Sequence, residues 1–120
     1  FLSWQYGDLQ DIYVMNADGT NRTNITNNPE FPEFNPVWSP DGKYIAYMVD
    51  EDDGYRVTGS DIYVVTANGK RKFQITKTDE INEMYPSWSP SGNKLAFNST
   101  DGDIFIADLI IGKTGVSDEK

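Results

Sequence analysis

A heptapeptide with a central tryptophan occurs twice in the chain and decides the fold. It reads Pro36-Val37-Trp38-Ser39-Pro40-Asp41-Gly42, and 50 residues later Pro86-Ser87-Trp88-Ser89-Pro90-Ser91-Gly92. Four further pairs share this offset: Asp11-Ile12-Tyr13-Val14 with Asp61-Ile62-Tyr63-Val64, Ala17-Asp18-Gly19 with Ala67-Asn68-Gly69, Ile25-Thr26 with Ile75-Thr76, and Ile45-Ala46-Tyr47 with Leu95-Ala96-Phe97. A third, shorter copy of one motif is Asp103-Ile104-Phe105-Ile106, which lies 42 residues beyond Asp61. Five matches in register indicate an internal repeat.

Each repeat consists of short predicted strands separated by turns. Residues 12–15 and 62–65 are rich in the β-branched and aromatic side chains that strands favour. Asp18-Gly19 and Asn68-Gly69 follow them, and such pairs supply the positive φ of a tight hairpin. No stretch has a sustained apolar period of 3.6 residues, so no long helix is predicted. Four strands per repeat of this length are typical of a propeller blade. The sequence therefore predicts an all-β chain that forms a partial β-propeller of four-stranded antiparallel blades.

These motifs resemble the blades of TolB-like, WD-repeat-like β-propellers. The resemblance lies in the Asp-Ile-Tyr-Val segment, the Asp-Gly turn, the Trp-Ser-Pro-Asp-Gly motif and the Ile-Ala-aromatic strand after it. Residues 11–47 follow this pattern, and residues 61–97 follow it again, with Asn68 and Ser91 at two of its aspartate positions. Residues 103–107 begin a third copy. The resemblance implies the fold, because the matched residues form the scaffold of a blade.

The repeats divide the chain into about two and a half blades. We expect an incomplete blade at 1–28, a full blade at 29–78, an incomplete blade at 79–111 and a polar C-terminal tail at 112–120. Closed propellers have about four to eight blades, and an isolated blade exposes apolar faces that its neighbours should cover. The chain is therefore expected to be a piece of a longer propeller, or to complete a ring by associating with identical chains.

The composition excludes several classes of function. Acidic residues outnumber basic ones 19 to 10, and the net charge of −9 argues against binding to nucleic acid or to anionic bilayers. The chain has no histidine and no cysteine, which excludes Ser-His-Asp and Cys-His catalysis, disulfides and zinc ribbons within it. No apolar run approaches the roughly 20 residues of a membrane span. We expect a chain that is not an enzyme and that has no cofactor, no nucleic-acid partner and no membrane insertion.

The candidate metal ligands are weak. The run Asp50-Glu51-Asp52-Asp53-Gly54 resembles a calcium loop, but its glycine stands at position 5 rather than 6, and no glutamate follows at position 12. A solvated hairpin tip is the simpler interpretation, and calcium binding by residues 50–53 stays open. Asp101-Gly102-Asp103 is interpreted in the same way, as a turn. No metal ligand is assigned.

Two other charged groups have structural interpretations. Asp11, Asp61 and Asp103 share one repeat position, and each is predicted to tie its own blade together by accepting backbone N–H bonds. Convergence of such carboxylates for glycoside cleavage is the alternative. The basic trio Lys70-Arg71-Lys72 follows a hairpin turn and is predicted to be a charged turn rather than a phosphate site.

The positions of the tryptophans in the repeats allow a prediction of where their side chains pack. Trp38 and Trp88 are repeat equivalents and are both expected to pack between blades, so that replacing either by alanine costs about 3–5 kcal/mol. Trp4, which lies with Tyr6 before the first repeat, is either an exposed anchor for a partner or is buried against the rest of a ring.

Two functions remain open. The first is a non-catalytic protein–protein interaction module. The resemblance to TolB-like proteins, which bind partner proteins and peptides at the bacterial envelope, implies a protein or peptide partner and a periplasmic or extracellular location. The second is part of the gating propeller of a prolyl-oligopeptidase- or tricorn-like serine peptidase, with the catalytic domain outside this chain. A Gly-x-Ser-x-Gly elbow in neighbouring sequence would favour the second. The motifs assign no binding residue.

Overall fold

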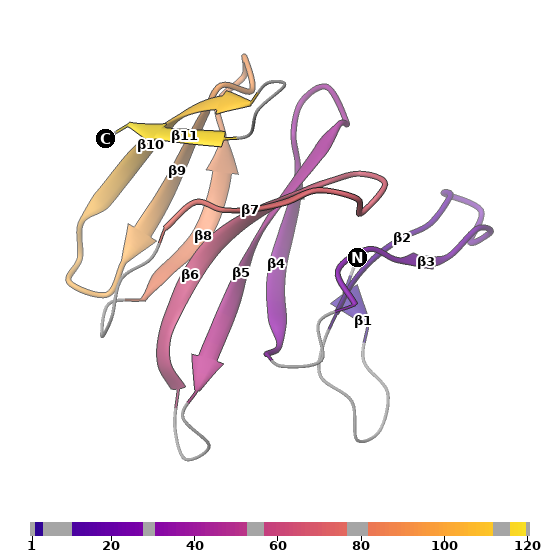
Figure 1. The fold of residues 1–120 in the computed structure, drawn as a ribbon, viewed down its shortest axis with the longest axis horizontal. Helices are drawn as coiled ribbons and strands as arrows, with labels where there is room; N and C mark the ends of the chain where they lie inside the picture. Colours follow the sequence, from indigo (N-terminus) through magenta and orange to yellow (C-terminus); the bar gives the residue numbers. More distant parts are fainter. Residues whose placement is uncertain are drawn as a thin grey trace.

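The computed structural model describes residues 2–3, 11–27, 31–52, 57–76, 82–111 and 116–119, which form three antiparallel sheets (Figure 1). Blade 1 comprises β1 (Leu2–Ser3), β2 (Asp11–Val14) and β3 (Thr23–Asn24). Blade 2 comprises β4 (Glu33–Trp38), β5 (Tyr44–Asp52), β6 (Val57–Thr66) and β7 (Lys72–Gln74). Blade 3 comprises β8 (Glu83–Trp88), β9 (Lys94–Ser99), β10 (Ile104–Ile111) and β11 (Val116–Glu119). The described residues contain no helix, and so none that could span a membrane. The predicted all-β partial propeller is confirmed.

The third blade has more strands than the sequence predicted. β11 lies inside the stretch 112–120 that was expected to be a polar tail, and it pairs with β10 over the register Asp108↔Glu119 to Ile111↔Val116. Its sequence, Val-Ser-Asp-Glu, lacks the apolar alternation by which a strand is recognised. An edge strand can be held by backbone hydrogen bonds alone, so a polar sequence does not prevent the pairing.

The Ser-Pro-Asp-Gly segment forms the turn that links the first two strands of blade 2. The backbone N–H of Ser39 donates to the carbonyl of Tyr44 at 2.8 Å, and that of Gly42 donates to Ser39 at 2.9 Å. Asp41 closes the turn by accepting from the Ser39 hydroxyl at 2.6 Å and from the Lys43 N–H at 3.0 Å. These bonds, that from Ser39 above all, lower the pKa of the Asp41 carboxyl. Gly42 has a φ of +74°, which favours glycine. The motif therefore recurs because the turn requires it.

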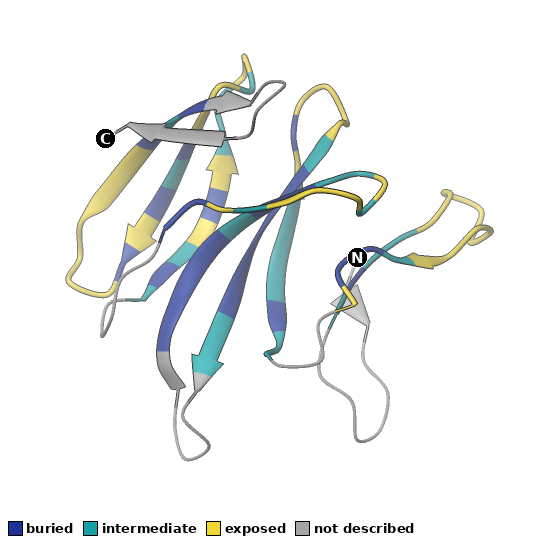
Figure 2. Cartoon of the chain, viewed as in Figure 1, coloured by how far each residue is buried: buried dark blue, intermediate teal, exposed yellow. Residues whose placement is uncertain are grey.

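Blade 2 is buried on both faces, as the dark blue of β5 and β6 shows (Figure 2). Successive side chains of a strand point to opposite faces, and β5 uses both. Its residues Ile45, Tyr47 and Val49 belong to the core between blades 1 and 2. Its residues Ala46 and Met48 belong to the core between blades 2 and 3. One strand thus contributes to two interfaces.

The two repeated tryptophans have different environments. Trp88 is half-buried against the core between blades 2 and 3, and its Nε1–H donates to the carbonyl of Val37 in β4 at 3.1 Å. Trp38, by contrast, is 49% exposed, so the prediction that it packs like Trp88 is wrong. The reason is that Trp88 packs beside the first strand of the preceding blade. The described part of blade 1 has no strand equivalent to β4, and Trp38 has no such neighbour.

The turn of blade 2 approaches blade 1 closely at Gly69. A Cβ at this position would lie 2.7 Å from the carbonyl oxygen of Ile25, and the φ of Gly69 is +76°. At the equivalent Gly19 no atom lies within 4 Å of such a Cβ. Of these two turns, that at Gly69 needs glycine both for its backbone angle and for the contact between blades, whereas that at Gly19 needs it for the backbone angle alone.

We expect Trp88→Ala to destabilise the chain by about 2 kcal/mol, because it removes a half-buried ring and a hydrogen bond between blades. Trp38→Ala should cost less than about 1 kcal/mol, as is usual for an exposed side chain. Urea unfolding followed by far-ultraviolet circular dichroism measures both values. Equal losses for the two variants would show that the environments are alike, contrary to the structure.

Candidate functional site

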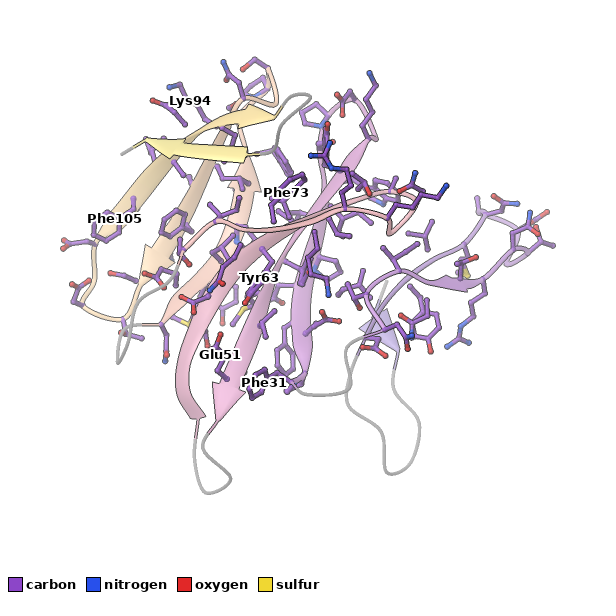
Figure 3. All side chains as sticks on the ribbon, viewed as in Figure 1. Phe31, Glu51, Tyr63, Phe73, Lys94 and Phe105 are labelled. Atoms are coloured by element: carbon purple, nitrogen blue, oxygen red, sulfur yellow. The ribbon has the colours of Figure 1, made fainter. Side chains whose placement is uncertain are left out.

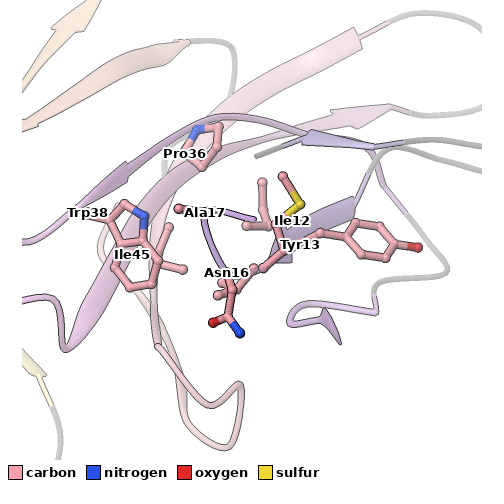
Figure 4. A pocket seen from close by; sticks show the side chains of 9 residues that line it. Ile12, Tyr13, Asn16, Ala17, Pro36, Trp38 and Ile45 are labelled. Atoms are coloured by element: carbon pink, nitrogen blue, oxygen red, sulfur yellow. The ribbon is translucent and has the colours of Figure 1, made fainter. Parts of the chain in front are cut away.

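A groove of about 250 Å³ lies between blades 1 and 2 (Figure 4). It is lined by residues 12–17 of β2 and the turn after it, by Pro36 and Trp38 of β4 and by Ile45 of β5. The side chain of Tyr13 points away from Trp38 (Figure 4) and lies under the guanidinium of Arg22, whose Cζ is 4.7 Å from the ring centroid.

The groove has the chemistry of a binding surface. Its lining has no carboxylate, ammonium or guanidinium group, so it offers no strong acid or base for catalysis. Its most prominent side chain is the exposed indole of Trp38, whose N–H has no acceptor among the described residues. Tryptophan is enriched among the residues that dominate the energy of protein interfaces. The groove is therefore suited to an apolar ligand that also brings a hydrogen-bond acceptor.

A buried carboxyl group lies at the opposite end of β4. Glu33 is 0% exposed; its Oε1 accepts from the Thr26 hydroxyl, while its Oε2 has no partner in the described structure. The hydroxyl of Tyr47 is also buried without a partner. Burial raises the pKa of Glu33 to about 7; the Asp11 carboxylate adds to the rise, and the Thr26 hydroxyl and Lys72 oppose it. The Glu33 carboxyl is therefore largely protonated at weakly acidic pH.

The next repeat contains a related arrangement. The Thr76 Oγ1 accepts from the N–H of Ile62 at 2.9 Å and lies 3.2 Å from the Asp61 Oδ1 and 3.4 Å from the Glu83 Oε2. Thr26 likewise accepts from the N–H of Ile12, at 3.0 Å. The repeat motifs quoted from the sequence do not include these glutamates, although Glu33 and Glu83 share the 50-residue offset and precede Pro36 and Pro86. Their shared offset is the sequence signal from which the buried glutamates could have been predicted.

The repeated aspartates do not converge on one site. Asp11 accepts from the Asn24 side-chain amide at 2.9 Å, and Asp61 lies within hydrogen-bond distance of the Thr76 hydroxyl. Each of these contacts joins side chains of the same repeat, and acceptance of backbone N–H bonds by the aspartates stays a prediction. The side chain of Asp103 is exposed in its turn.

The acidic run lies partly in a strand. β5 extends through Asp52, and Asp50 accepts from the Ser60 hydroxyl on β6, so this part is no free loop. Asp53 and Gly54 lie outside the described residues. In the described part of the chain, no three His, Cys, Asp or Glu residues are grouped so that they could hold a metal ion. Asp101 accepts from the Ser99 hydroxyl, which lowers the pKa of its carboxyl, and the segment is a turn.

Two side chains of the basic trio contact different groups (Figure 3 draws the side chains of the described residues and labels Phe73). Arg71 lies over the Phe73 ring, with its Cζ 5.0 Å from the centroid. Lys72 donates to the Thr26 carbonyl of the neighbouring blade at 3.4 Å. Trp4 and Tyr6, the candidate exposed anchor, lie outside the described residues.

We expect the stability of the chain to fall between pH 5 and pH 9 through Glu33. Its folded-state pKa of about 7 exceeds the ordinary value of 4.5, so the folded chain retains a proton that the unfolded chain releases. Stability from this group is complete below pH 4.5 and declines as pH rises through 7, by about 3 kcal/mol in all. Glu33→Gln, which is neutral throughout, should flatten the decline.

Urea unfolding of both forms at pH 5 and pH 9 makes the comparison. Asp18→Asn is the control, because hydrogen bonds from Thr20 lower the pKa of this exposed carboxyl and it is ionised throughout the range. A decline of the same size in Glu33→Gln as in the unaltered chain would assign the effect to another group.

Comparison with known proteins agrees with this architecture. A solved structure of a TolB protein from Agrobacterium tumefaciens is similar to the chain, with a TM-score of 0.68 and 24% sequence identity. The match covers 98% of this chain and 43% of that one, so the chain spans less than half the length of the TolB structure. The blades are TolB-like in fold. No curated protein matches the chain. The family model of the dipeptidyl peptidase IV (DPP IV) N-terminal region matches residues 39–117, more than half of the sequence, and the chain belongs to that family.

Proposed function

We propose that the chain is a non-catalytic propeller module that functions by binding protein. The observation that carries this proposal is an exposed apolar pair on β10. Ile104 is 72% exposed and Ile106 is 55% exposed, whereas their repeat equivalents in blade 2, Ile62 and Val64, are 0% exposed. Figure 2 shows the exposed stretch of β10 in yellow. The same strand positions are therefore buried in blade 2 and exposed in blade 3.

The partner we propose is a surface that resembles the face of a blade. In blade 2 the equivalent residues lie in the core that blade 3 completes. Apolar side chains exposed side by side on a strand indicate an interaction site. The rest of a propeller, or an identical chain that completes a ring, would supply the covering face. The net charge of −9 opposes self-association, but salt at physiological strength screens charges beyond about 8 Å.

The proposal that the module is not an enzyme rests on composition. The chain has no histidine and no cysteine, and the groove lining offers no acid–base pair. No cofactor, nucleic acid or membrane insertion is part of the proposal. We further propose a periplasmic or extracellular location, which rests on the TolB-like blades alone.

A second candidate function is favoured by the family to which the chain belongs. Membership of the dipeptidyl peptidase IV N-terminal family is compatible with a propeller that gates a serine peptidase. The catalytic domain would then lie outside these residues. Neighbouring sequence with a Gly-x-Ser-x-Gly elbow would support this candidate over an independent binding module.

We expect the isolated chain to associate through the Ile104 and Ile106 face. Light scattering coupled to gel filtration should give a mass above 13.6 kDa that falls on dilution. Ile106→Asp places a charge on the face and should shift the chain toward the monomer. Ser91→Asp is the matched control: it adds the same charge at an exposed turn where blade 2 carries Asp41. A sharp 13.6 kDa peak for the unaltered chain at all concentrations would contradict self-association through this face.

A further inference from the structure

We propose that the buried carboxyl group of Glu33 is a proton-controlled latch between blades 1 and 2. With its proton the carboxyl holds blade 1 against blade 2, and without it this junction opens while the junction of blades 2 and 3 stays closed. The inference goes beyond the proposed function, because it concerns an internal junction rather than the exposed face of β10. It also goes beyond the stability decline expected above, since it assigns the effect of the proton to one junction.

The segment Ile25-Thr26 of blade 1 contacts two strands and a turn of blade 2. The Thr26 hydroxyl donates to Oε1 of Glu33 on β4, and the Thr26 carbonyl accepts from the Nζ of Lys72 on β7 at 3.4 Å. The turn at Gly69 lies so close to the Ile25 carbonyl that it leaves no room for a Cβ. Glu33 and Lys72 therefore contact blade 1 at the same residue, and a change of charge at Glu33 acts directly on this contact.

Two buried polar atoms of the junction have no hydrogen-bond partner in the described structure. They are Oε2 of Glu33 and the hydroxyl of Tyr47, and both residues are 0% exposed. The two side chains lie on the same face of blade 2, because Glu33 pairs with Val49 and Tyr47 stands two residues before Val49 on β5. The single proton of the Thr26 hydroxyl already goes to Oε1. A buried carboxylate oxygen without a donor is costly, so this geometry favours the protonated acid.

The charged and titratable groups that face Glu33 favour the same form. Burial raises the pKa of Glu33 to about 7; Lys72 on β7 opposes the rise, and the Asp11 carboxylate on β2 adds to it. Burial also raises the pKa of Tyr47 on β5 and of Tyr63 on β6, so both hydroxyls are neutral when Glu33 titrates. Ionised Glu33 would face the Asp11 carboxylate of the neighbouring blade, whereas Lys72 is exposed and screened by solvent. Closure is therefore strongest below pH 4.5 and weakens as pH rises through 7.

The other junction provides a comparison within the chain. Glu83 stands there at the repeat position of Glu33, and Phe97 stands at that of Tyr47. Oε2 of Glu83 lies 3.4 Å from the Thr76 hydroxyl. Among the described residues, the buried side-chain atoms without a partner are those of Glu33 and Tyr47, and none belongs to the junction of blades 2 and 3. The latch is therefore assigned to the first junction alone.

Amide hydrogen exchange in the ¹⁵N-labelled full chain, measured as protection factors at pH 6 and pH 8.5, tests the latch. Ile25 and Ile75 are matched reporters, because each donates its N–H at 2.8 Å to a carbonyl of its own blade. Protection of Ile25 should fall about tenfold, since opening returns the Glu33 carboxyl to its ordinary pKa. Protection of Ile75 should not change, because opening of the other junction leaves Glu33 buried. An equal fall at both amides, or no fall at Ile25, would overturn the latch.

A matched pair of variants assigns the effect to one carboxyl group. Glu33→Gln, which has no proton to lose in this range, should abolish the fall at Ile25, and Glu83→Gln should leave it unchanged. A fall that persists in Glu33→Gln would overturn the latch. The ¹³C shift of the Glu33 carboxyl in the unaltered chain supplies a test that needs no variant. It should titrate with the same midpoint as the exchange at Ile25, and titration near the ordinary pKa of 4.5 would overturn the proposal.

Discussion

The architecture depends on one constraint, which is that blade 2 is covered on both faces. β5 satisfies it by placing Tyr47 in one interface and Ala46 in the other, both fully buried. A slip of one residue in the pairing of β5 would exchange a large ring for a methyl group on each side. The register of this strand therefore fixes how blades 1 and 3 can pack against blade 2. It thereby also fixes the positions of the groove between blades 1 and 2 and of the exposed face of β10.

Local chemistry explains why so much of the fold could be predicted. The turn closed by Asp41 and Gly42 needs only neighbouring residues, so its sequence reveals it wherever it occurs. Trp38 could not be placed in the same way, because its burial depends on a strand of another blade rather than on its own motif. β11 was not predicted because backbone pairing at a sheet edge leaves no apolar pattern. Glu33 was overlooked since its burial arises only when two blades meet.

The interface between blades 1 and 2 has different chemistry at its two ends. At one end of β4 the Glu33 carboxyl lies beside Thr26 without solvent, and at the other end Trp38 borders an open groove. The equivalent interface between blades 2 and 3 has Phe97 where the first has Tyr47, and its tryptophan, Trp88, is half-buried. Repeats that share a scaffold have thus acquired different interfaces, which is how a propeller gains distinct surfaces without a change of fold.

The contrast between Gly19 and Gly69 bears on how the chain can be engineered. Exposed loop tips that contact nothing are the sites at which proteins accept inserted sequence. The turn at Asp18-Gly19 meets this condition, because a Cβ at Gly19 would have no atom within 4 Å apart from those of its chain neighbours. The turn at Asn68-Gly69 does not, since its backbone lies against the carbonyl of Ile25. An epitope tag or a circularly permuted terminus therefore belongs in the first turn, even though the two turns derive from the same repeat.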